Sequence, residues 1–170
     1  MKITLVDKND NVIGEAERGM ERDGVDIYRV SALWLVNSRD ELLVVRRAYT
    51  KAHHPGRLAC SVAGTVEVGE TYLSNVEKEA EEELGVTGVE FEELFKDFRD
   101  GQYLHFTMWY VGECDLEIGD FKADPREVAE IFWMKYEDVV QDLKDNPDGW
   151  VGAGKSLEYM GEWIKNRRTK

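Results

Sequence analysis

The alternation of apolar and polar positions predicts a chain rich in strands. A pair of short amino-terminal strands is separated by KNDN (residues 8–11). Residues 28–36 and 42–47 are rich in aliphatic and β-branched side chains and flank the polar turn NSRDE, which predicts a hairpin of largely buried strands. Further strands are predicted at residues 89–98, 103–114 and 127–134.

Three segments have the periodicity of helices. In residues 71–84, Thr71 suits an N-cap and Gly85 a left-handed C-cap. Residues 136–146 and 154–168 are amphipathic and predict two carboxy-terminal helices. Strands on both sides of one central helix, followed by closing helices, predict a layered α/β domain.

Composition and charge restrict the class of partner. The 170 residues, 42% of them hydrophobic, suffice for one domain with one sizeable core. A net charge of −13 repels polyanions, so nucleic-acid polymers and anionic membrane surfaces are not expected as partners. A small anion can still bind locally, and a homodimer is a possible assembly. With no signal peptide or membrane-length apolar run, we expect a cytoplasmic protein in which Cys60 and Cys114 are buried, reduced thiols.

The helix at residues 71–84 is unusually acidic. At about 100° per residue, Glu79, Glu82 and Glu83 share one face. Neighbouring like charges cost about 0.2 to 0.5 kcal/mol per pair, and the helix dipole adds repulsion, so folding alone gives no reason for this arrangement. Taken alone, the face is either solvated or a site for a hard cation such as Mg²⁺. The same projection predicts a core stripe of Leu73, Val76, Ala80 and Leu84, and places Glu77 and Glu81 in water.

The residues before this helix complete a longer pattern, GTVEVGETYLSNVEKEAEEELGV, residues 64–86. Gly64 is followed after five residues by Glu70, and after seven more by Lys78, Glu79, Ala80, Glu82, Glu83, Gly85 and Val86. This segment resembles the Nudix hydrolase signature. Lys78 stands where the family has arginine, which keeps the positive charge but loses the planar fork that clamps a carboxylate. Ala80 at an aliphatic position is a milder departure.

The resemblance implies a single Nudix domain over residues 1–170, with a mixed β-sheet layered between helices as an α/β/α sandwich. It implies that Glu79, Glu82 and Glu83 bind Mg²⁺ or Mn²⁺, often with the backbone carbonyl of Gly64. The implied reaction is hydrolysis of a pyrophosphate linkage in a nucleoside diphosphate joined to another group, which resists water until divalent ions neutralise its oxygens. Glu70 corresponds to a glutamate that braces the loop in the family.

Two further segments supply candidates for catalysis and substrate binding. One of the three helix glutamates, or Glu127 or Glu130 from DPREVAEIFW, would take the proton from water, and Glu127 is our candidate outside the helix. The segment RRAYTKAHHPGR has four positive charges, two histidines and no acid. We expect its arginines to bind substrate phosphates, with only one of the first two pointing inward. These arginines are Arg46, Arg47 and Arg57.

Aromatic and histidine side chains give weaker signals. Trp34, Tyr103, Trp109 and Tyr110 could stack on a base, although aromatic residues in strands usually belong to the core. The adjacent His53 and His54 lack the further ligands that a metal pair needs.

Two alternative functions stay open. The stretch from residue 34 to residue 70 also resembles isopentenyl-diphosphate isomerase, a branch of the same fold. Ala63 and Thr65, however, replace its proton-transferring cysteine and its histidine ligand, and Gln102 and Leu104 stand where it has a glutamate pair. The other alternative is a Nudix-like domain that senses a nucleotide without cleaving it. The sequence leaves open the linked group, the general base, the number of metal ions and the oligomeric state.

Overall fold

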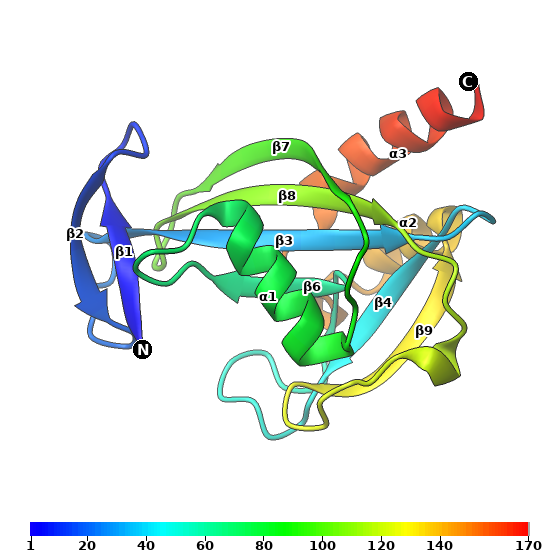
Figure 1. Cartoon of the computed structure of the whole chain (residues 1–170), viewed down its shortest axis with the longest axis horizontal. Coiled ribbons are helices and arrows are strands. Elements are labelled where there is room, and N and C mark those ends of the chain that lie inside the picture. Colours follow the sequence, from blue (N-terminus) through cyan, green and yellow to red (C-terminus); the bar gives the residue numbers. More distant parts are fainter. Residues whose placement is uncertain (170) are drawn as a thin grey trace.

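The computed structural model describes residues 1–169 and is built around one long buried strand, β3 (Ile27–Val36). β3 pairs in parallel with β8 (His105–Glu113) and antiparallel with β1 (Lys2–Val6) and β6 (Val62–Thr65). Four hydrogen-bonded pairs extend the sheet from there (Figure 1). They are β1 with β2 (Val12–Glu17), β8 with β7 (Phe91–Arg99), and β4 (Glu41–Arg47) with both β9 (Val128–Lys135) and the short β5 (Leu58–Ala59).

The expected hairpin of β3 and β4 closes only at its turn. Val36 pairs with Leu42, but beyond that point β3 pairs with β6 and β4 pairs with β9. The buried Ser61 bridges the strands where they diverge, because its hydroxyl accepts from Leu35 N at 2.8 Å and donates to Leu43 O at 2.7 Å. The sequence predicted both strands correctly but was wrong about how far they pair.

Helices cover both faces of the sheet. α1 (Tyr72–Leu84) lies across one face, and α2 (Tyr136–Asp145) and α3 (Gly154–Arg168) pack on the other (Figure 1). Each face has its own apolar cluster, and successive residues of β4 point into alternate clusters, as expected for a pleated strand. The predicted α/β/α arrangement is therefore confirmed. Two short 3₁₀ turns, Ile118–Asp120 and Pro147–Gly149, complete the elements in residues 1–169.

The predicted ends of α1 are confirmed. Thr71 Oγ1 accepts from Ser74 N at 3.0 Å, while Ser74 Oγ accepts from Thr71 N at 2.9 Å, which makes a reciprocal capping box. Gly85 ends the helix in the left-handed conformation, with φ of 69°.

One position in the predicted core stripe is wrong. Val76, Ala80 and Leu84 are buried, but Leu73 is 40% exposed. Asn75 occupies the inward position in the first turns instead, and it accepts a hydrogen bond from Ser31 Oγ at 2.5 Å. A buried amide with a buried hydroxyl partner replaces the apolar contact that the periodicity suggested.

The amino-terminal hairpin is tied to the rest of the fold through Asp10. Its carboxylate accepts from Arg29 Nε at 2.7 Å, from Lys96 Nζ at 2.6 Å and from the Tyr72 hydroxyl at 3.1 Å. These partners belong to β3, β7 and α1, so one side chain fastens the β1–β2 turn to three elements.

No helix described within residues 1–169 is both long and apolar enough to cross a membrane.

We predict that Asp10→Asn lowers the free energy of unfolding by about 1 to 3 kcal/mol at pH 7. Burial raises the pKa of Asp10, but Lys96, Arg29 and Tyr72 outweigh it and hold the pKa below its ordinary value. The stabilisation is therefore present above the pKa of the unfolded chain and is lost as pH falls through the folded pKa. Denaturant titrations should show the difference from wild type shrinking below about pH 4. Glu158→Gln, on the exposed side of α3, is the control, and a difference that persists unchanged at pH 3 would contradict this role of Asp10.

Candidate active site

The inward side of α1 presents two of the three candidate glutamates. Glu79 and Glu83, one helical turn apart, are partly buried, whereas Glu82 is exposed at the edge of the same face. Glu77 and Glu81 are exposed, as the helical projection predicted. The acidic helix is thus not uniformly solvated, because two of its carboxylates turn toward the sheet.

Gly64, in β6, makes room for the first of these carboxylates. A methyl group at Gly64 would lie 2.5 Å from Cδ and 2.6 Å from Oε1 of Glu79. The Glu79 carboxyl group therefore occupies the space where any other residue would place its Cβ. This close approach explains in physical terms why glycine stands at the first position of the segment.

Lys78 binds two carboxylates of the loop that precedes α1. Its ammonium lies 2.6 Å from Glu67 Oε1 and 2.6 Å from Glu70 Oε1. Glu70 Oε2 also accepts from Glu67 N at 2.9 Å and from Asn75 Nδ2 at 2.8 Å. Burial raises the pKa of Glu70, but the hydrogen bonds from Lys78, Glu67 N and Asn75 hold it below its ordinary value. The loop before α1 is thus fixed by charged hydrogen bonds, which supports the bracing role expected for Glu70.

Glu83 is the most strongly perturbed carboxylate of the site. Burial, followed by the negative charges of Glu79 and Glu127, raises the pKa of Glu83 to about 8, against the opposing effect of Lys51 and Arg47. Burial and the charges of Glu82 and Glu70 also raise the pKa of Glu79. Carboxylates with raised pKa values in a polar cleft are typical of functional sites.

Glu127 directly precedes β9, beside the end of β4, and forms an ion pair with Lys51. Lys51 was not among the predicted site residues. It lies in the basic segment between β4 and β5, and its effect on Glu83 places it beside the glutamates. The concentration of positive charge in RRAYTKAHHPGR was the signal that could have identified it.

The three predicted substrate-binding arginines have different surroundings. Arg46 is turned to the face opposite α1, where Nε donates to Glu130 Oε2 at 2.7 Å and Nη1 donates to Gly56 O at 3.1 Å. Arg47, the next residue along β4, points to the side of α1 and acts on Glu83. The two neighbouring arginines therefore lie on different faces of β4, and which of them binds substrate stays a prediction. Arg57 is partly buried at the end of the same loop.

The aromatic candidates divide as expected between core and surface. Trp34, Trp109 and Tyr110 are buried, while Tyr103 is 41% exposed and its ring contacts that of His53 edge-on, with centroids 6.1 Å apart. Both predicted thiols, Cys60 and Cys114, are buried and free. Cys60 lies between β5 and β6, and its thiol donates to Val62 O.

The predicted cation site of three carboxylates is found only in part. Within residues 1–169, no three acidic, histidine or cysteine side chains are gathered closely enough to hold a metal ion by themselves. Glu82 shares a face with the other two glutamates without converging on them. Mg²⁺, however, is commonly held by one or two carboxylates together with waters and substrate phosphates. The oxygen donors of Glu79 and Glu83 suit that mode of binding.

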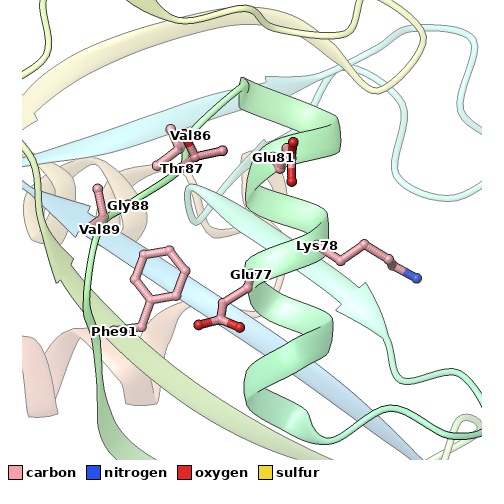
Figure 2. Close-up of a pocket in the computed structure, with 8 residues that line it drawn as sticks. All are labelled: Glu77, Lys78, Glu81, Val86, Thr87, Gly88, Val89 and Phe91. Carbon is pink, nitrogen blue, oxygen red and sulfur yellow. The ribbon is translucent and has the colours of Figure 1, made fainter.

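A separate cavity of about 260 Å³ lies on the outer side of α1 (Figure 2). Glu77 and Glu81 border it on the helix, and Val86 to Val89 and Phe91 border it on the segment that leads into β7. None of Glu79, Glu82 and Glu83 lines it, so it is distinct from the inward-facing glutamates.

Comparisons with known proteins agree with this geometry. The NUDIX domain model matches residues 27–152. This chain belongs to the Nudix family. It is 31% identical over 163 residues to an uncharacterized Nudix hydrolase of Yersinia pestis, covering 95% of this chain and 85% of the relative.

Two other relatives illustrate the breadth of the family. A prenyl-diphosphate phosphatase of Methanosarcina mazei is 30% identical over 154 residues, covering 89% of each chain. The crystal structure of DR0079 from Deinococcus radiodurans superposes with a TM-score of 0.79 at 24% identity, covering 93% of this chain and 98% of that one, which shows the Nudix fold. The prediction that the chain is an enzyme of the Nudix hydrolase class is confirmed.

We predict that Glu83→Gln stabilises the metal-free protein at alkaline pH. The folded pKa of about 8 exceeds the unfolded value of about 4.3, so the free energy of unfolding of wild type falls as pH rises between these values. Glutamine does not titrate. In chelator, the variant should therefore match wild type near pH 5 and exceed it by about 1 to 3 kcal/mol at pH 9. Glu81→Gln, exposed on the same helix, is the control; a Glu83→Gln effect independent of pH would contradict the raised pKa.

Proposed function

We propose that this Nudix protein is a divalent-metal-dependent hydrolase that cleaves a pyrophosphate linkage in a nucleoside diphosphate joined to another group. The observation that carries the proposal is the placement of the Glu79 carboxyl group directly over Gly64, with Glu83 one turn further along α1. Bound Mg²⁺ or Mn²⁺ would neutralise the phosphate oxygens and lower the barrier to attack by water. Glu79, Glu82, Glu83 and the carbonyl of Gly64 are the groups that would hold these ions.

The reaction requires a base for the attacking water. The water oxygen forms a bond to phosphorus, the bridging P–O bond breaks, and the leaving phosphate takes the electron pair of that bond. Glu127 is our candidate to accept the proton from water, because its negative charge is one cause of the raised pKa of Glu83, which indicates that the two carboxylates are neighbours. Glu130 is a poorer candidate, since its carboxylate pairs with Arg46 on the other face. In this scheme Lys51 holds Glu127 in place.

Substrate phosphates would be bound by the basic segment opposite α1. Arg47 and Lys51 are the cations whose charges reach Glu83, so they suit a diphosphate bound between them and the glutamates. Arg57 stands further along the same loop. Arg46 supports the loop through its bond to Gly56 O, and we assign it a structural contribution to substrate binding.

A prenyl diphosphate is the second candidate substrate. The Methanosarcina relative is named as a prenyl-diphosphate phosphatase, and we propose that the chain is an isomerase-like branch of the family that performs hydrolysis. Isomerisation itself is disfavoured by the alanine at position 63 and by the burial of Cys60. Alanine at position 63, in β6, cannot transfer a proton, and the buried Cys60 lies outside that strand.

The wider setting forms part of the same proposal. We propose that residues 1–170 act as a single Nudix domain. β1 and α3 lie outside the region that the family model matches, yet β1 pairs with β3 and α3 packs on the sheet, which supports one domain. Two buried cysteines without a disulfide fit a reducing compartment, so we place the enzyme in the cytoplasm. A homodimer is compatible with this activity.

We predict that Glu83→Gln reduces turnover at least about 100-fold in saturating Mg²⁺, a loss of about 3 kcal/mol in barrier lowering. The substitution removes one carboxylate oxygen donor and keeps the size of the side chain. Phosphate release is the measurement, and Glu81→Gln should retain the wild-type rate. Equal rates for wild type and Glu83→Gln would remove this residue from the site.

Chelation should abolish turnover and leave the cooperative melt largely intact, because the apolar stripe of α1 does not depend on metal ions.

A panel of candidate substrates, assayed with Mg²⁺ and with Mn²⁺, would determine the substrate class. Nucleotide sugars, dinucleoside polyphosphates, nucleoside triphosphates and prenyl diphosphates, including isopentenyl diphosphate, separate the candidates. We expect phosphate-containing products from at least one nucleotide. Release from prenyl diphosphates alone would favour the second candidate, whereas conversion of isopentenyl diphosphate without phosphate release would favour isomerisation. Tight nucleotide binding without turnover would favour a sensing domain.

A further inference from the structure

Most arginines of this acidic protein are neutralised by a neighbouring carboxylate. The chain contains 35 Asp and Glu residues against 22 Lys and Arg. Of its eleven arginines, eight have a carboxylate oxygen within 4.0 Å. Within residues 1–169, no such partner lies beside the other three, which are Arg47, Arg57 and Arg99.

These three arginines come from different elements but meet around one loop residue, His54. Arg47 Nε and Nη2 donate to His53 O at 3.3 and 3.2 Å, and Arg57 N donates to His54 O at 3.4 Å. Arg47 N in turn donates to Arg57 O at 2.9 Å, so the base of the loop is closed by backbone bonding. Both arginines are therefore held at a loop of fixed shape.

Arg99 reaches the same place from the end of β7. Its guanidinium lies against Gly152, where an added methyl group would be 2.7 Å from Nη1. The β7–β8 turn that follows Arg99 contacts the loop through the edge-on rings of Tyr103 and His53. Burial, and then the charges of the three arginines and of His53, hold the pKa of His54 below its ordinary value. Permanent positive charges are thus concentrated at one surface site with no carboxylate between them.

This cluster adjoins the active site, because the loop that Arg47 contacts through His53 O also carries Lys51, which is paired with Glu127. We propose that Arg47, Arg57 and Arg99 form an anion subsite that binds a phosphoryl group of the substrate lying beyond the cleaved linkage. The inference rests on the proposed hydrolase function and extends it, because it selects substrates with an additional phosphate. Guanidinium groups bind phosphoryl oxygens through paired, charge-assisted hydrogen bonds. We assign Arg99 as the specificity-determining residue. It belongs to β7 and not to the basic segment that binds the cleaved diphosphate, so it contacts only a substrate that has a further phosphoryl group.

The kinetic test compares Arg99→Gln with Arg39→Gln. Arg39 is exposed in the turn between β3 and β4, pairs with Glu41, and its substitution removes the same unit of charge. With a nucleoside triphosphate or a dinucleoside polyphosphate, Arg99→Gln should raise KM about tenfold and leave kcat within about twofold. With a prenyl diphosphate, which has no further phosphoryl group, both variants should match wild type. The subsite is refuted if Arg99→Gln behaves like Arg39→Gln on the cleaved compounds that carry a further phosphoryl group.

A binding test is independent of turnover. Inorganic phosphate is titrated into ¹⁵N-labelled full-length protein in chelator, and the Nε–Hε signals of the arginines are followed by NMR. The signals of Arg57 and Arg99 should shift and saturate, the Arg39 signal should stay in place, and Arg99→Gln should weaken binding at least about fivefold. Equal, unsaturated shifts at all arginines would overturn the subsite.

The two measurements separate this inference from the proposed function. Saturable phosphate binding with unchanged KM values in Arg99→Gln would mean that the site takes free phosphate, which overturns the assignment to substrate. If wild type cleaves no compound of the panel, the proposed function fails, while the titration still decides whether the arginines bind an anion.

Discussion

The withdrawal of two like-charged carboxylates from water is the constraint on which this site depends. Glu79 and Glu83 lie one turn apart on α1 and both have raised pKa values, so ionising them inside the folded protein costs free energy. Such an arrangement persists only where the surrounding structure holds the side chains in place. In this protein the glycine at position 64, the capped helix and the braced loop before it supply that support.

The positive charges around the site form two groups. Lys78 is paired most closely with Glu67 and Glu70 of the loop before α1, and its ammonium also lies 3.9 Å from Glu79 Oε1. Lys51 and Arg47 carry the charges that oppose the raised pKa of Glu83, and Lys51 is also paired with Glu127. The first group holds the loop before α1, whereas in the second group Arg47 has no carboxylate partner within residues 1–169 and can bind an anion. This division explains why lysine can replace arginine at position 78, because its bracing contacts are two single ammonium bonds and do not require a planar fork.

Local chemistry made much of the fold predictable. Thr71 and Gly85 marked the ends of α1 because caps depend on neighbouring backbone groups, and the exposure of Glu77 and Glu81 followed from helical geometry. Contacts between distant segments could not be predicted in this way. Leu73 is exposed because Asn75 finds its partner Ser31 on β3, and Lys51 belongs to the site because the pairing of β9 with β4 brings Glu127 beside it. The early separation of β3 from β4 also required knowledge of where β6 inserts.

The parallel pairing of β3 with β8 has a consequence for how the molecule forms. Tyr28 and His105 are paired across the sheet although about 77 residues separate them in the chain, and α1 lies within that interval. Closing so long a loop is entropically costly before its contacts are made, and domains dominated by non-local pairing fold in milliseconds to seconds. The helix that carries the glutamates can therefore cap and coil early, whereas the cleft around it is assembled only when the two halves of the chain meet. Catalytic competence is then acquired at the end of folding, and a nascent chain released before β8 has been synthesised would have the signature segment without a working site.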